Sequence, residues 1–264
     1  MSAPQAQTSY RTRDVLFGAS NLALYLPRVV SMARGALDGP LEIFVACGLG
    51  RSYGEWTSVL SRELPGIGQA GLWDAVCTAH AERPLPTVAL AVDVGNDLVY
   101  GVQAERVAGW VATCLDRLSE IEARTTLALL PMPSIEALGK ARFNLVRSIL
   151  FPSHNVRLDG VRDQARTLQR QLRAIADERG LCAVEQQGEW YGLDPIHIRM
   201  LRAGPAWSTI LGAWGPASAE AALTRSERTR VRRGRPATRR VRGRTREREQ
   251  PSVRLDDGSA ILMF

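Results

Sequence analysis

The stretch Asp14–Ser20, DVLFGAS, predicts the fold class, because an apolar strand here runs through a glycine directly into a helix. Residues 21–35, which follow it, have the apolar spacing of an amphipathic helix. An apolar strand followed by a helix is the repeating unit of α/β proteins. We therefore expect a first strand whose carboxyl end lies against the beginning of a helix.

The same alternation continues through most of the chain. Further apolar runs typical of strands lie at residues 41–50, 87–97, 125–133 and 181–188, and helical periods lie at 103–124, 134–150 and 159–179. Continuous apolar strands separated by helices predict a mostly parallel sheet that is covered on both faces. The last apolar segment of this pattern is at 206–214, where we expect the compact domain to end.

The end of the chain differs in composition from the rest. Residues 218–264 contain thirteen Arg, no Lys and six acidic residues, which account for the whole net charge of +7. Residues 218–250 have few apolar side chains to bury, so this segment predicts disorder. We expect a flexible N-terminus at 1–12, one folded domain at 13–217 and a disordered Arg-rich tail at 218–264.

Composition also excludes several classes of protein. A charge confined to a tail does not describe a basic nucleic-acid groove on the folded domain. The four cysteines lack C-x-x-C spacing, and the three histidines are far apart, so we expect no metal site and no cofactor. The first residues lack the apolar core of a secretory signal and no run is long enough to span a membrane, so we expect no leader, no membrane span and a cytoplasmic location.

Small and polar residues follow three of the predicted strands. Ligands of parallel sheets bind beyond the carboxyl ends of the strands. The Ser20 hydroxyl would lie there near a helix N-terminus, which suits an activated nucleophile, although Ser20 or Asn21 also suits a simple helix cap. Gly50 and Asn96 could donate hydrogen bonds to an oxyanion, although each is also an ordinary turn residue.

A carboxylate and a histidine lie three residues apart in the segment DPIH, which holds Asp194 and His197. A serine nucleophile needs a base such as histidine, and an acid that orients the ring. The alternative is that Asp194 caps a helix with Pro195 at its first position. Arg51 has two interpretations as well, a contact with an anionic substrate group or a solvated surface position.

In this order, the four blocks FGASN, GLGRSYG, DVGND and DPIH resemble the SGNH hydrolases, also called the GDSL esterase and lipase family. The resemblance covers residues 13–215. It implies a flavodoxin-like three-layer αβα sandwich with about five mostly parallel strands. Ala19 stands where the family often has Asp, and Val94 stands where the third block often has a glycine.

The resemblance also implies a function and a set of site residues. The function is hydrolysis of a small-molecule carboxylic ester through an acyl-serine intermediate. The implied nucleophile is Ser20, with His197 as base and Asp194 as acid. The implied oxyanion donors are Ser20, Gly50 and Asn96, with Gly48 as the alternative to Gly50. A competing hypothesis is a catalytically decayed SGNH-like protein whose basic tail binds nucleic acid through phosphate contacts.

Overall fold

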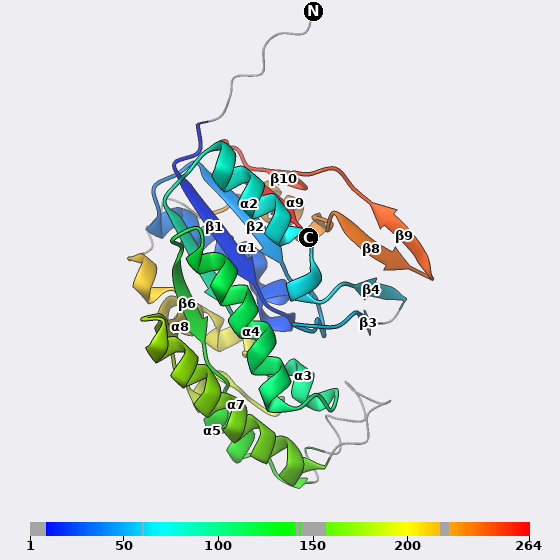
Figure 1. The fold of residues 1–264 in the computed structure, drawn as a ribbon. Helices are drawn as coiled ribbons and strands as arrows, with labels where there is room; N and C mark the ends of the chain where they lie inside the picture. Colours follow the sequence, from blue (N-terminus) through cyan, green and yellow to red (C-terminus); the bar gives the residue numbers. More distant parts are fainter. Residues whose placement is uncertain (1–8, 60, 141–142, 144–156, 217–221) are drawn as a thin grey trace, which may run out of the picture.

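The computed structural model describes residues 9–59, 61–140, 143, 157–216 and 222–264 (Figure 1). Its centre is a seven-stranded sheet in the order β10-β11-β2-β1-β5-β6-β7. The strands are β1 (Thr12–Phe17), β2 (Leu41–Ala46), β5 (Thr87–Ala91), β6 (Arg124–Ala128), β7 (Cys182–Val184), β10 (Val253–Arg254) and β11 (Ala260–Met263). All neighbours are parallel except β10 and β11.

The five predicted strands form the middle and one edge of this sheet. Their order, β2-β1-β5-β6-β7, is the flavodoxin-like order. Every residue of β1 and β2 is buried, as expected for parallel strands covered on both faces. The predicted α/β fold with a mostly parallel sheet is therefore confirmed.

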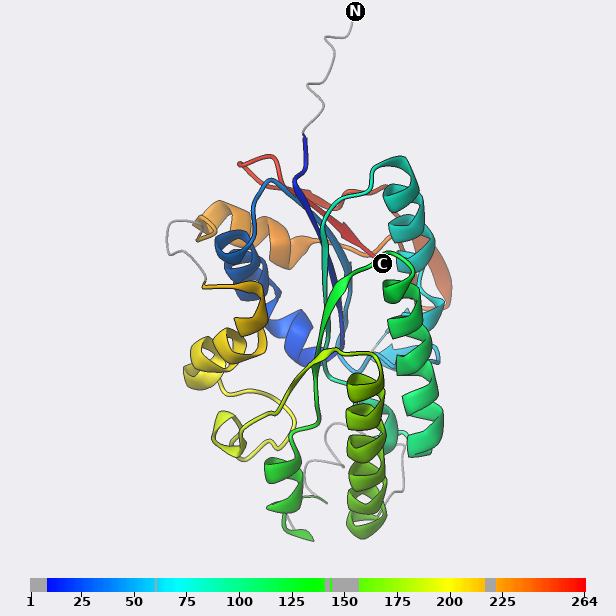
Figure 2. The same ribbon diagram turned by 60° about the vertical axis from the view of Figure 1, so that its left-hand side comes forward.

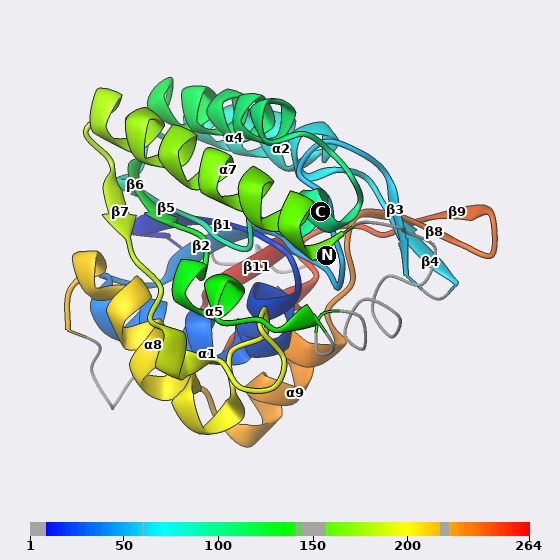
Figure 3. The same cartoon turned by 90° about the horizontal axis from the view of Figure 1, so that it is seen from below.

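Helices cover both faces of the sheet, which gives three layers (Figures 2 and 3). One face carries α2 (Leu72–Glu82), α4 (Ala104–Ser119) and α7 (Leu158–Glu178), and the other carries α1 (Ser20–Ala36), α8 (Ala203–Ile210) and α9 (Arg225–Arg233). Two short helices, α3 (Asn96–Val99) and α5 (Met132–Glu136), follow β5 and β6. Most of the helix predicted at 134–150 lies outside the described residues.

Short 3-10 turns complete the helical elements, at Ile67–Gln69, Gly188–Trp190, Met200–Arg202 and Gly212–Trp214. Among the described segments, no helix combines the length and the apolar character needed to cross a bilayer.

The predicted disorder of residues 218–264 is wrong for the part that the structure describes. Residues 222–264 contain α9, two strands of the central sheet and a hairpin. The strand β11 lies parallel to β2, with Ile261 opposite Ile43, and Ile261 is fully buried. The last apolar residues of the chain therefore complete the central sheet.

Apolar contacts and satisfied charges both explain why this basic segment folds. Val231 and Val253 are buried in the core on the α1 face of the sheet. Thr224 and Glu227 form a capping box at the start of α9. Glu227 is almost fully buried and pairs with Arg34 at 3.3 Å, so its charge is compensated where it is desolvated.

A second, small sheet projects from the body (Figure 1). Its order is β3-β4-β8-β9, and all its neighbours are antiparallel. The strands are β3 (Thr57–Val59), β4 (Arg62–Leu64), β8 (Thr238–Val241) and β9 (Arg244–Glu247). The Arg-rich part of the chain thus forms a hairpin on a loop that follows β2.

Candidate active site

Ser20 is the first residue of α1, directly beyond the carboxyl end of β1. Its exposed fraction is 5%, and its hydroxyl makes no hydrogen bond with another described residue. The residue that precedes the helix is Ala19, and no side chain of this segment caps it. The helix-cap interpretation of Ser20 or Asn21 is therefore wrong, and the hydroxyl of Ser20 is not used in capping.

The carboxylate of Asp93 satisfies the first turn of α1 instead. Its Oδ2 accepts the main-chain N–H of Ala19 at 3.0 Å and of Leu22 at 3.1 Å, and its Oδ1 accepts the Asn21 amide at 2.8 Å. An anion at this position is favoured by the helix dipole. Asp93 itself has a φ of 62°, a left-handed conformation that Asp tolerates better than most residues.

Asp194 and His197 form the predicted pair. His197 Nδ1 lies 2.6 Å from Asp194 Oδ2. The other oxygen of Asp194 accepts the N–H groups of Ile196 at 3.0 Å and of His197 at 3.2 Å. These bonds close a turn and no helix begins here, so Asp194 orients the ring but does not cap a helix. The outer nitrogen, Nε2, is left for another partner.

Charge around the ring sets its affinity for a proton. Burial lowers the pKa of His197, but the hydrogen bond that the ring donates to Asp194 and the charges of Asp194 and Asp93 outweigh it, so the pKa is raised. Burial also works to raise the pKa of Asp194, but hydrogen bonds from the His197 ring and from N–H groups outweigh it and keep this pKa below its usual value. A carboxylate beside an imidazole that readily gains a proton is the electrostatic arrangement of a general base.

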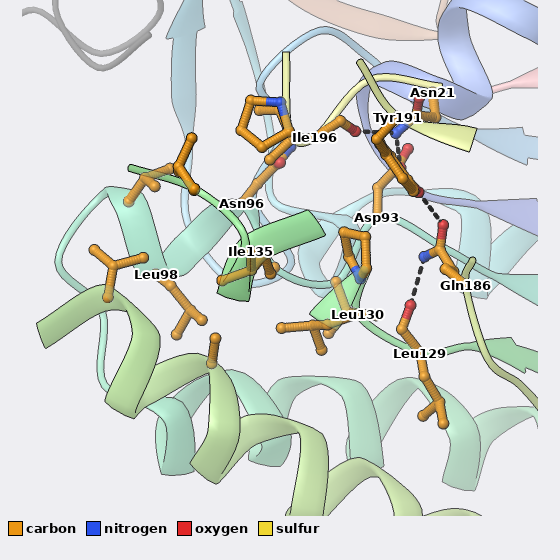
Figure 4. Close-up of a pocket in the computed structure, with 18 of the residues that line it drawn as sticks. Asn21, Asp93, Asn96, Leu98, Leu129, Leu130, Ile135, Gln186, Tyr191 and Ile196 are labelled. Atoms are coloured by element: carbon orange, nitrogen blue, oxygen red, sulfur yellow. Dashed lines mark hydrogen bonds between the residues drawn. The ribbon is translucent and has the colours of Figure 1, made fainter. Parts of the chain in front are cut away.

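Asn21 connects the two halves of the site. Its Nδ2 donates to the Ile196 carbonyl at 2.8 Å (Figure 4). Its Oδ1 accepts the Ile198 N–H at 2.8 Å. The Tyr25 hydroxyl also donates to the Ile198 carbonyl, at 2.6 Å. The peptide groups on both sides of His197 are therefore held by the first turns of the helix that begins with Ser20. No direct hydrogen bond joins Ser20 to His197 among the described residues.

The predicted oxyanion residues lie on two connected segments. Asn96 begins α3, and Tyr100, directly after α3, donates its hydroxyl to the Gly50 carbonyl at 2.6 Å. Gly50 has a φ of 62°, a conformation that favours glycine. Asp97 Oδ2 accepts the Tyr53 N–H at 2.9 Å, which fixes the two segments a second time. Gly48, the alternative donor, lines a separate cavity.

An apolar cavity opens beside these residues (Figure 4). Its empty volume is about 890 Å³, a figure that includes space open to solvent. Asn21, Asn96 and Ile196 line it, and each belongs to a different block of the sequence pattern. The rest of its wall is mostly apolar, with residues that include Leu98, Leu130, Ile135, Leu138 and Phe143.

Arg51 fits neither of its two interpretations. Its side chain is fully buried, with Nε donating to the Pro65 carbonyl at 2.9 Å and Nη1 to a main-chain oxygen of Phe264 at 2.5 Å. Burial lowers the pKa of Arg51 to about 10. Arg51 therefore fixes the loop after β2 to the C-terminal segment, and it does not face a substrate.

Sequence reasoning missed the roles of Asp93, Asn21 and Tyr100. Asn21 and Asp93 belong to the quoted blocks, but their partners are distant: Asn21 binds Ile196 and Ile198, and Asp93 binds the first turn of α1. For Asp93, the only signal in the sequence was its position at the end of a predicted strand, two residues before Gly95. Within the described ranges, no three His, Cys, Asp or Glu residues lie together in a way that could hold a metal ion.

Several solved structures are similar to this chain. A psychrotrophic esterase EstA from Pseudoalteromonas sp., inhibited by monoethylphosphonate, has a TM-score of 0.44 and 10% identity over 76% of this chain and 97% of its own. TesA has a TM-score of 0.45 and 13% identity over 77% and 99%, and the acetyl xylan esterase AlAXEase has 0.44 and 11% over 76% and 98%. No protein-family model and no curated protein matches the sequence. Two of these three structures are named as esterases.

Proposed function

We propose that this protein is a serine esterase, with Ser20 as nucleophile, His197 as general base and Asp194 as the acid that orients the base. The observation that supports this most is the pair of hydrogen bonds between Asn21 and the peptide groups on both sides of His197. They join the main chain around His197 to the first turn of the helix that begins with Ser20, which supports the proposed pairing of the two side chains. The hydrogen bond expected between the two side chains often forms only when substrate binds.

In the first half of the reaction, the Ser20 oxygen attacks the ester carbonyl carbon while His197 Nε2 takes the hydroxyl proton. The tetrahedral intermediate then breaks its bond to the alcohol oxygen, which receives that proton from His197. Water hydrolyses the acyl-serine by the same steps, and the acid product leaves with Ser20 restored. Asp194 stabilises the imidazolium that forms twice in this cycle.

The negative charge on the carbonyl oxygen needs donors that are already in place. We assign this role to the N–H groups of Ser20 and Gly50 and to the Asn96 amide. The hydrogen bond from Tyr100 to Gly50 and the position of Asn96 at the start of α3 support a fixed spacing between these donors. The loss of one such donor typically lowers turnover by about 10² to 10³.

The apolar cavity beside Asn21 and Asn96 suits the acyl part of the substrate. Its wall is mostly aliphatic, and Asn21, which follows Ser20, and Asn96, a proposed oxyanion donor, are among its few polar residues. Transfer of an alkyl chain from water into such a wall is favourable by about 0.8 kcal/mol per methylene. The proposed substrate is therefore a small-molecule ester with an apolar acyl chain.

A serine-directed fluorophosphonate tests the nucleophile directly. The Ser20 oxygen should displace fluoride from phosphorus and leave a stable phosphonyl-serine, which peptide mass spectrometry locates. The same probe applied to His197→Ala should label weakly, because the base is missing. A label found on a different serine, or equal labelling of Ser20 in heat-unfolded protein, would contradict the assignment.

The titration of His197 provides a separate prediction. Asp194 donates no proton here but stabilises the charged ring, and with Asp93 it raises the His197 pKa above the ordinary 6.5. Asp194→Asn removes one of these negative charges, so the midpoint of the His197 imidazole signal in an NMR pH titration should move to lower pH. His197→Gln identifies the signal. An unchanged or higher midpoint would show that Asp194 does not act on the ring.

A further inference from the structure

A second cavity lies near Ser20, on a different side of α1. Ala23, Leu26 and Pro27 of α1 line it, whereas Asn21 lines the apolar cavity. Each residue of a helix is rotated by about 100° from the one before it, so the side chains of Asn21 and Ala23 point to nearly opposite sides of α1. The first turns of α1 therefore separate the two cavities. The empty volume of the second is about 610 Å³ out to open solvent.

Three arginines from different elements converge on this second cavity. Arg62 comes from β4, Arg232 from the last turn of α9, and Arg235 from the loop after it. Among the described residues, no acidic side chain lines the cavity. An adjoining hollow shares Arg235, and it adds Arg239, Arg246 and Arg248, with Glu247 as its one acid.

The pairing of the small sheet explains why these charges gather on one side. Arg239 lies opposite Arg246, and Arg62 lies opposite Val241, so alternation along β8 places these three arginines on the same face. Glu63 and Arg240, which also lie opposite each other, take the other face and pair at 3.8 Å. One face of the small sheet is thus basic, whereas on the other face the charge of Arg240 is neutralised by Glu63.

Like charges held this close repel each other and need a counter-charge. Burial lowers the pKa of Arg239, and the positive charges of Arg235, Arg62, Arg248 and Arg246 lower it further. None of these five arginines forms an ion pair with an acidic residue in the part of the chain that the structure describes. An anion is the group that this surface lacks.

The cavity also lies close to the reacting groups. Its wall includes Gly48, two residues before Gly50, and Ala23, one helical turn after Ser20, which is about 5 Å along the helix. Cys47 lines it too, and burial raises the pKa of this thiol to about 12, so the thiol is neutral and does not repel an anion.

We propose that this cavity binds a phosphate group on the alcohol part of the ester, held by Arg62, Arg232 and Arg235. A guanidinium group can donate two parallel hydrogen bonds to two oxygens of one phosphate group. These bonds form most readily where no acidic side chain already occupies the guanidinium. The inference rests on the proposed esterase function. The substrate would then lie across the beginning of α1, with its acyl chain in the apolar cavity and its phosphate on the arginines.

A matched pair of substrates tests this inference. 1-Octanoylglycerol and 1-octanoylglycerol 3-phosphate have the same ester bond and differ only in the phosphate. The wild-type protein should hydrolyse the phosphorylated ester with a kcat/KM roughly tenfold higher or more, since a charge-assisted hydrogen bond contributes at least that factor. Arg62→Gln and Arg235→Gln should each remove most of this preference through KM, with the neutral ester unaffected.

Arg240→Gln is the control, because Arg240 is on the same strand as Arg239 but on the opposite face. It should leave the preference intact. Equal kcat/KM for the two esters, or an equal loss in Arg62→Gln and Arg240→Gln, would overturn the inference while leaving the esterase function in place. If neither ester is hydrolysed, the esterase function fails, and glycerol 3-phosphate binding by calorimetry decides on the anion site. Binding that Arg62→Gln abolishes supports the site, and binding that it leaves unchanged overturns it.

A nucleic acid is the other polyanion that this surface could attract. Its backbone would span the hairpin, so Arg246→Gln should weaken binding of a single-stranded oligonucleotide as much as Arg62→Gln does. Tight, salt-dependent oligonucleotide binding without any preference for the phosphorylated ester would overturn the substrate site and favour a nucleic-acid surface.

Discussion

Replacement of Ser20 by alanine is expected to lower the turnover of 4-nitrophenyl octanoate by roughly 10⁴- to 10⁶-fold, the range seen when a serine nucleophile is removed. No other group in the proposed site can form the acyl intermediate. The fold should be unaffected, because the Ser20 hydroxyl has no hydrogen bond among the described residues and Asp93 satisfies the helix start. The melting temperature should therefore match that of the wild type.

Ser226→Ala is a suitable control, since Ser226 is exposed on α9. It should retain full activity. A folded Ser20→Ala protein that hydrolyses the ester at the wild-type rate would exclude the acyl-serine mechanism. Activity lost together with the melting transition would point to a folding defect, which the phosphonate labelling of the wild-type protein separates from a defect in chemistry.

Deletion of residues 217–264 is expected to abolish cooperative folding. The segment includes Val231, Val253, Leu255, Ile261 and Met263, all buried. Burial of one such side chain stabilises the native state by about 1.5–3 kcal/mol, so five of them contribute roughly as much as the whole 5–15 kcal/mol stability of a typical domain. Circular dichroism of the truncated protein should show no sharp thermal transition.

A point substitution separates the strand itself from the length of the deletion. Ile261→Asp places an unpaired carboxylate in the fully buried centre of β11, and it should lower the melting temperature strongly. Thr245→Asp makes the same kind of change on the exposed strand β9, and it should have little effect. Equal melting temperatures for Ile261→Asp and the wild type would contradict the role assigned to this strand.

The five strands β2, β1, β5, β6 and β7 and the helices α1, α4 and α7 could be predicted because each carries its own apolar pattern, whereas β3, β4 and α2 between residues 50 and 87 were not predicted. The C-terminal segment could not be predicted. Its apolar residues are few and follow a long charged run, and β11 pairs with β2, more than 200 residues earlier. A charged composition correctly excludes an independent core, but it says nothing about a strand that completes an existing sheet.

In the candidate site too, contacts between residues close in sequence could be predicted, and contacts between distant residues could not. The short spacing between Asp194 and His197 allowed their contact to be predicted, since both lie within one turn. The role of Asp93 could not be predicted, because a carboxylate at the end of β5 satisfies a helix start that lies more than 70 residues earlier in the chain. Local propensity describes which residues cap a helix within a segment, and it does not describe a cap supplied by a neighbouring strand.

The contact between β2 and β11 also bears on how the protein is made. On a ribosome, the first 216 residues emerge well before β11 does, and during that time one edge of β2 has no partner. An unpaired hydrophobic edge can pair with another chain, and such species aggregate readily. Arg51 donates a hydrogen bond to Phe264, which lies 213 residues later in the chain. The loop that carries Gly50 therefore cannot reach its final contacts until the last residues have been synthesised. We expect high yields of active protein only where chaperones are abundant.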